Sequence, residues 1–111
     1  MSSNLRWLTR KEIEEVFKKG KLYQGISLFL KIKKNNLLSL RNAIIVPLEI
    51  TKKSTKRNKI KRQIREILRE ELKTTKTGFD KIFIAKKAIL NKNYREIKKE
   101  IRNLLEKTKN L

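Results

Sequence analysis

The spacing of apolar residues changes along this chain, and each change decides which secondary structure a segment can form. Apolar residues three or four positions apart share one face of a helix, whereas residues two apart share one face of a strand. The spacing predicts helix 9–19, strand 22–33, strand 44–50, helix 58–72, strand 81–87 and helix 94–105. This α-β-β-α-β-α order predicts an α/β fold, an α+β sandwich in which helices pack on a sheet of three or four strands.

The expected helix ends carry recognisable signals. Thr9 and Glu12 fit a capping box, in which each side chain accepts a hydrogen bond from the other residue's backbone N–H. Asn93 and Glu96 predict a second N-terminal cap, before the last helix. Gly20 follows the first helix, and we expect it to end that helix in a left-handed conformation.

The two alternating segments in the first half of the chain predict half-buried strands. The expected inward residues are Ile26, Leu28, Leu30 and Ile32 in the first strand and Ile44, Val46, Leu48 and Ile50 in the second. Residues 34–42 form the connection between them. Pro47 offers no backbone N–H, so the second strand should lie at a sheet edge or carry a bulge there.

The segment 52–65 holds eight cations and no acid. On a helix, Ile60, Ile64, Ile67 and Leu68 gather on one side, and Asn58, Arg62, Arg65 and Arg69 line the opposite side. Thr77 and Gly78 break this helix. A charge run is usually a solvated helix face, but such faces mix signs so that neighbours attract. Here the arginines repel one another and only Glu66 and Glu70 lie nearby, so binding of a polyanion is the favoured interpretation.

Composition agrees with a folded domain that binds an anionic partner. The chain has 111 residues, and 31 Lys and Arg against 11 Asp and Glu give a formal charge of +20. Its 38% of hydrophobic residues argue against disorder, and we expect one domain over 1–111 with a loose tail at 107–111. The absence of Cys and His excludes zinc fingers, disulfides and imidazole bases. Without a signal-peptide core or an apolar run of about 20 residues, the expected location is the cytoplasm.

Charge alone leaves the kind of polyanion open. A basic amphipathic helix can lie on an anionic membrane, but here its apolar face is needed for the core. Reading of DNA in the major groove stays open at this point. Phe29 and Lys31 lie on the strand face opposite the core residues, and an aromatic ring beside cations is suited to stacking single-stranded bases. Phe17 joins them if the first helix borders that face, and is otherwise an ordinary core residue.

Five segments, in this order along the chain, resemble the protein component of bacterial ribonuclease P. RNKIKRQIRE at 57–66 looks like the RNRIKR-type signature of that family. The other segments are LTRKEIEEVFKKGK at 8–21, ISLFLKI at 26–32, GFDKIFIAKK at 78–87 and YREIKKEIRNLLEK at 94–107. The resemblance therefore spans residues 5–107.

The resemblance implies a ribonucleoprotein role. In the family, a large RNA subunit carries the active site and its Mg²⁺ ions and cleaves precursor tRNA to free the mature 5′ end. The protein itself should then hold no catalytic residue, metal or cofactor. The implied partners are the catalytic RNA and precursor tRNA, with neither DNA nor a membrane. The family's fold also contains a left-handed βαβ crossover, against the general right-handed rule.

Carried over residue by residue, the resemblance implies two RNA sites. Arg57, Asn58, Lys61, Arg62 and Arg65 match the signature, whose helix contacts the catalytic RNA in the family. Together with the cations around them, the expected RNA-binding residues are Lys52, Lys53, Lys56, Arg57, Asn58, Lys59, Lys61, Arg62, Arg65 and Arg69. A cleft between the first helix and the sheet holds the 5′ leader there, and its matching residues are Ile13, Phe17, Phe29 and Lys31.

This sequence departs from the family pattern in three places. Lys59 replaces an Arg and cannot make its two-pronged phosphate contact. Ile13 and Lys31 replace aromatic residues, which makes leader binding depend more on charge. Residues 46–49 read VPLE where the family often has V-S-K-K, and we expect Lys52 and Lys53 to supply that charge instead.

Two other functions compete with this one. Small basic α/β domains also occur as ribosomal or other structural RNA-binding proteins. A protein nuclease would need clustered carboxylates to hold its metal ions, whereas the 11 acids of this chain are dispersed.

Overall fold

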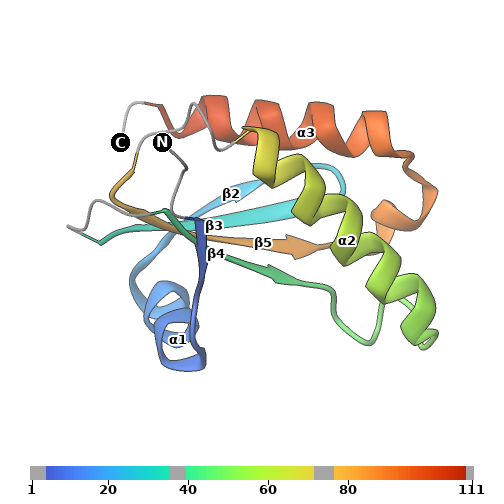
Figure 1. Ribbon diagram of the computed structural model, residues 1–111, viewed down its shortest axis with the longest axis horizontal. Helices are drawn as coiled ribbons and strands as arrows, with labels where there is room; N and C mark the ends of the chain where they lie inside the picture. Colours follow the sequence, from blue (N-terminus) through green and yellow to red (C-terminus); the bar gives the residue numbers. More distant parts are fainter. Residues whose placement is uncertain (1–4, 36–39, 72–76, 110–111) are drawn as a thin grey trace.

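The computed structural model describes residues 5–35, 40–71 and 77–109 (Figure 1). The elements are β1 Leu5–Trp7, α1 Arg10–Lys19, β2 Lys21–Gln24, β3 Leu28–Lys34, β4 Leu40–Ile45, α2 Ser54–Glu71, β5 Phe79–Ala85, the 3-10 helix η2 Lys87–Asn91 and α3 Tyr94–Lys107. The three predicted helices are confirmed. The strands depart from the prediction in number and bounds.

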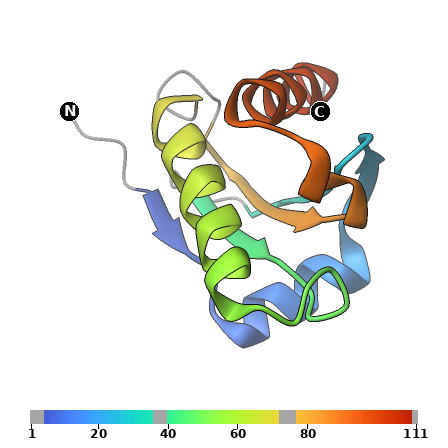
Figure 2. The same cartoon turned by 90° about the vertical axis from the view of Figure 1, so that its right-hand side faces the viewer.

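All five strands form one sheet, in the order β1-β4-β5-β3-β2. β1, β4 and β5 run parallel, and β3 is antiparallel to both β5 and β2. α1 lies on one face of the sheet, and α2 and α3 lie on the other (Figures 1 and 2). The predicted sandwich is confirmed, with five strands instead of three or four.

An apolar core fills each side of the sheet. The larger core, under α2 and α3, includes Leu28, Leu30 and Phe83. The smaller core, under α1, is built around Leu8, Val16, Ala43 and Ile82. Ile82 and Phe83 are neighbours in β5 and both are fully buried. β5 is therefore covered on both faces, because successive strand residues point to opposite sides.

β4, α2 and β5 form a crossover between two adjacent parallel strands. Figure 2 looks onto the C-terminal ends of these strands, with α3 above the sheet, α1 below it and α2 running down the left-hand side. α2 packs on the same face of the sheet as α3, because both helices contribute to the larger core. The chain leaves β4, passes back through α2 and enters β5 to the right of β4. This connection is left-handed, as the resemblance implied and contrary to the usual rule.

Both predicted helix caps are confirmed, whereas the predicted conformation of Gly20 is wrong. Complete capping boxes join Thr9 with Glu12 and Asn93 with Glu96. Gly20 is extended, with φ −78° and ψ 161°. Glycine is required there by space, because a Cβ atom would lie 2.5 Å from the carbonyl oxygen of Val16.

β2 and β3 form an antiparallel hairpin where one long strand was predicted. Leu28, Leu30 and Ile32 point into the core as expected, but Ile26 lies in the turn and is 70% exposed. The carboxylate of Glu100, on α3, accepts hydrogen bonds from the Ser27 backbone N–H at 2.9 Å and hydroxyl at 2.7 Å. A residue 73 positions away thus stabilises the turn.

β4 begins earlier than predicted and ends sooner. It spans Leu40–Ile45, so it takes in part of the expected connection 34–42, of which residues 36–39 lie outside the described residues. β4 lies between β1 and β5, not at an edge, and it ends before Pro47. The missing N–H of the proline therefore removes no bond from the ladder, and Leu48 is 68% exposed instead of buried.

α2 begins at Ser54, ahead of the predicted start. Leu72 and the tail residues 110–111 lie outside the described residues. Gly78 has a positive φ of 92°, a conformation that favours glycine, so the chain turns there as predicted.

Candidate nucleic-acid interface

α2 separates its apolar and polar residues onto opposite sides. Its buried residues are Ile60, Ile64, Ile67 and Leu68, all of which belong to the larger core. The exposed residues on the other side include Asn58, Arg62, Arg65 and Arg69. The rotational register that helical spacing predicted is confirmed.

The remaining cations of the signature segment lie around the start of α2. Lys52, Lys53, Lys56 and Lys59 are exposed, and Lys61 is half-buried. Arg57 is also half-buried, and its Nη1 donates a hydrogen bond to the carbonyl oxygen of Thr51 at 2.8 Å. Arg57 therefore secures the loop before the helix as well as adding charge.

Within the described residues, no cation of α2 forms an ion pair. The last acids of the helix pair with α3 instead: Glu70 with Lys98 at 3.7 Å and Glu71 with Arg102 at 2.9 Å. Because these carboxylates face a neighbouring helix, the arginine side of α2 keeps its repulsion. An anionic partner would relieve it.

The predicted leader-cleft residues lie on the other side of the sheet, next to α1. Phe29 pairs with Ile84 and Lys31 with Ile82 across β3 and β5, and both isoleucines belong to the α1 side. Phe17 is 43% exposed, so it is not an ordinary core residue. The Nζ of Lys31 lies 5.9 Å from the centroid of its ring. The structure thus brings Phe17 and Lys31 together and places Phe29 beside Lys31 on one strand face.

Ile13 and Lys86 also lie on this side. Ile13 is half-buried and packs against the smaller core, so part of its side chain supports α1. Lys86 was not predicted as a site residue, yet its Nζ lies 4.7 Å from the Phe29 ring centroid and donates to the Gly25 carbonyl oxygen at 3.0 Å. The contact between Lys86 and Phe29 depends on the register of β3 against β5, which cannot be read from the sequence.

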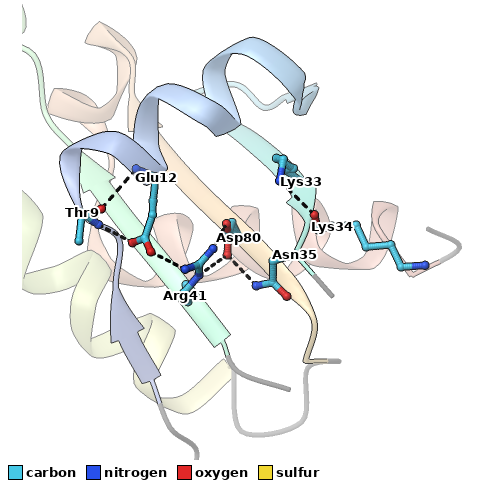
Figure 3. Close-up of polar contacts among 7 residues, drawn as sticks. All are labelled: Thr9, Glu12, Lys33, Lys34, Asn35, Arg41 and Asp80. Atoms are coloured by element: carbon cyan, nitrogen blue, oxygen red, sulfur yellow. Dashed lines mark hydrogen bonds and ion pairs between the residues drawn. The ribbon is translucent and has the colours of Figure 1, made fainter. Parts of the chain in front are cut away.

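A charged network fixes α1 to the sheet beside this surface (Figure 3). Arg41 donates two hydrogen bonds to Asp80, at 2.8 and 2.7 Å, and a further one to Glu12. Asn35 donates to the same aspartate at 2.7 Å. The hydrogen bond from the Thr9 backbone N–H is the largest cause of the lowered pKa of Glu12. The hydrogen bond to Asp80 raises the pKa of Arg41.

Nothing in the described ranges resembles a protein-borne catalytic centre. Among those residues, no group of three or more acidic side chains comes close enough together to hold a metal ion. The same part of the chain contains no helix that could cross a membrane.

Comparison with known proteins places the chain in a family. The family model for Ribonuclease P matches residues 1–109. A ribonuclease P protein component of Clostridium botulinum is 38% identical over 98 residues, 87% of each chain. One from Pseudanabaena is 33% identical over 101 residues, 90% of this chain and 87% of its own.

The fold is also shared with solved structures. The RNase P protein of Thermotoga maritima superposes with a TM-score of 0.84 at 29% identity and covers 94% of this chain and 97% of its own. The RNase P protein of Staphylococcus aureus has a TM-score of 0.83 at 22% identity, a likeness of fold alone. With nearly its whole length matched, the chain belongs to the ribonuclease P protein family, the protein components of an endoribonuclease that matures tRNA 5′ ends.

Proposed function

We propose that the basic side of α2 binds the catalytic RNA of ribonuclease P, while the α1 side of the sheet binds the 5′ leader of precursor tRNA. The absence of ion pairs on the α2 cations, within the described residues, supports the first assignment. Guanidinium groups bind phosphates in bidentate geometry, and three arginines follow one helix face. Two aromatic rings, each with a lysine over it, support the second, because single strands are held by stacking and charge together.

The protein's share of the reaction is binding and positioning. Most of the described carboxylates cap helices, pair with arginine and lysine or stabilise a turn, so we assign the catalytic Mg²⁺ ions to the RNA subunit. We also propose that the complex works in the cytoplasm. A ribosomal or other structural RNA-binding protein would need the same charge. Family membership favours ribonuclease P over it.

Reconstitution tests this function. The isolated protein should cleave no precursor tRNA, whereas the protein added to the ribonuclease P RNA of its own genome should lower the Mg²⁺ concentration and the salt needed for cleavage at the mature 5′ end. The RNA alone is the control. Cleavage at that position by protein freed of RNA would contradict the assignment of chemistry, and equal cleavage with and without protein would contradict the role itself.

A further inference from the structure

Trp7 is an exposed aromatic residue at the edge of the sheet. It is the only tryptophan of the chain, lies in β1 and remains 43% exposed. β1 is the terminal strand on the side of β4, so its outer edge has no neighbouring strand within the described residues. Figure 2 shows β1 next to α2.

The ring of Trp7 borders the basic side of α2. The guanidinium carbon of Arg65 lies 5.5 Å from the ring centroid, within the range of a cation–π contact. Arg65 stands between Arg62 and Arg69 on the exposed helix face and has no ion pair in the described parts of the chain. The cationic surface of α2 therefore continues without a break onto an aromatic ring.

We propose that Trp7 and Arg65 together bind one unpaired nucleotide of the partner RNA. The indole stacks on the base, and the guanidinium, still in contact with the ring, binds the phosphate of the same nucleotide. Unpaired bases stack on aromatic side chains in single-stranded RNA recognition, and arginine binds phosphate. This inference rests on the proposed binding of ribonuclease P RNA by α2 and adds a base contact to it.

The charge around Trp7 favours RNA over a protein occupant. A second copy of a chain with a net charge of +20 would be repelled from this edge. Singly exposed apolar residues such as Ile26, 70% exposed in the β2–β3 turn, need no ligand. Trp7 differs from Ile26 because an arginine without a counter-ion lies over its ring.

Tryptophan fluorescence, excited at a wavelength that the two tyrosines do not absorb, tests the proposal without any mutation, because the chain has a single tryptophan. The full chain is titrated with its ribonuclease P RNA, and binding is followed in parallel by filter retention. We expect the emission to be quenched, and acrylamide to lose access to the ring, at the same RNA concentrations that retain the protein. A fully base-paired RNA duplex should bind through charge but leave the emission unchanged.

Substitutions supply the second measurement. Trp7→Leu should weaken binding of the ribonuclease P RNA by roughly 5- to 150-fold, the factor that one stacked base contributes, without changing the salt dependence. Trp7→Phe should recover most of the loss. Ile26→Ala, an exposed apolar residue at the opposite edge, is the matched control and should change nothing. Circular dichroism establishes that each variant is folded.

The outcomes separate this inference from the function on which it rests. Retention of the RNA with unchanged emission, or equal affinities of wild type and folded Trp7→Leu, would refute the nucleotide site and leave α2 as the RNA contact. A self-association that Trp7→Leu abolishes would identify a protein interface instead. No retention of the ribonuclease P RNA under any salt condition would overturn both proposals.

Discussion

Two polar residues lie next to each other inside the protein. Lys81 of β5 and Asn42 of β4 are paired in register, with 1% and 0% of their surfaces exposed. Neither the Nζ of Lys81 nor the amide group of Asn42 has a hydrogen-bond partner. Burial lowers the pKa of Lys81 to about 8. The sequence predicts a short strand at 81–87, but it could not show that helices cover both faces of this strand and so bury Lys81.

We expect the stability of the protein to increase with pH between about 8 and about 10.5. In that window the unfolded chain carries the Lys81 proton and the folded chain has released it, so raising the pH favours the folded state. Below about 8 the cost of burying the charge is fully present and amounts to roughly 3 kcal/mol. Urea denaturation at several pH values across the window measures how the free energy of unfolding changes with pH.

The matched control is Lys81→Met, which keeps an unbranched side chain of nearly the same length without its charge. This variant should be more stable than the wild type at neutral pH, and the difference should shrink as the pH passes through the window. Other lysines titrate in both proteins, so only the difference between the two is informative. If the stability difference between wild type and variant does not change with pH, burial does not lower the pKa of Lys81.

At the scale of elements, α2 combines a core face and a binding face, and substitutions should separate them. Arg62→Ala with Arg65→Ala removes two exposed cations and should weaken binding of the ribonuclease P RNA while leaving the fold intact. Each lost phosphate contact should flatten the slope of log K against log salt by about 0.7 to 0.9. Filter binding at several salt concentrations measures the slope.

Ile64→Ala is the control on the buried face of the same helix. Ile64 is fully buried, so its truncation leaves a cavity and should cost roughly 2 to 5 kcal/mol in the free energy of unfolding. The salt slope should stay that of the wild type wherever the variant remains folded. An unchanged slope in the folded double arginine variant would remove the arginines from the interface.

The helices could be predicted from the sequence because each repeats its apolar pattern over several turns, and α1 and α3 also carry capping boxes. The strands could not, because their limits depend on contacts from elsewhere. β1 has only three residues, and the turn between β2 and β3 is stabilised by Glu100 of α3. The basic site could be predicted because it depends only on the spacing of residues along one helix, α2. Lys86 and Trp7 became visible only once neighbouring strands and helices were placed.

At the scale of the whole molecule, the two proposed RNA sites lie on opposite sides of one sheet. Substitutions in one site should therefore change tRNA binding differently from substitutions in the other. Phe29→Ala and Lys31→Ala should weaken binding of precursor tRNA to the reconstituted complex more than binding of mature tRNA, which has no leader. Stacking of one base on Phe29 would account for about 1 to 3 kcal/mol. Affinities for both tRNAs, measured with variants shown to be folded, test this division.

The arginine variants of α2 serve as the comparison. They should reduce assembly with the catalytic RNA and so affect both tRNAs alike. Equal losses for both tRNAs in the Phe29 and Lys31 variants would place those residues in assembly as well. No loss for either tRNA would leave Phe29 as a ring packed beneath Lys86.

The central position of β5 has a consequence for how the protein is made. β5 joins β4 to β3, yet it is supplied by Phe79–Ala85, after all four other strands have been synthesised. Until those residues leave the ribosome, β1 with β4 and the β2–β3 hairpin are two separate pieces with exposed strand edges. Translation of the last third of the chain therefore decides when the sheet closes, and a nascent chain that pauses before residue 79 presents two open edges to its surroundings.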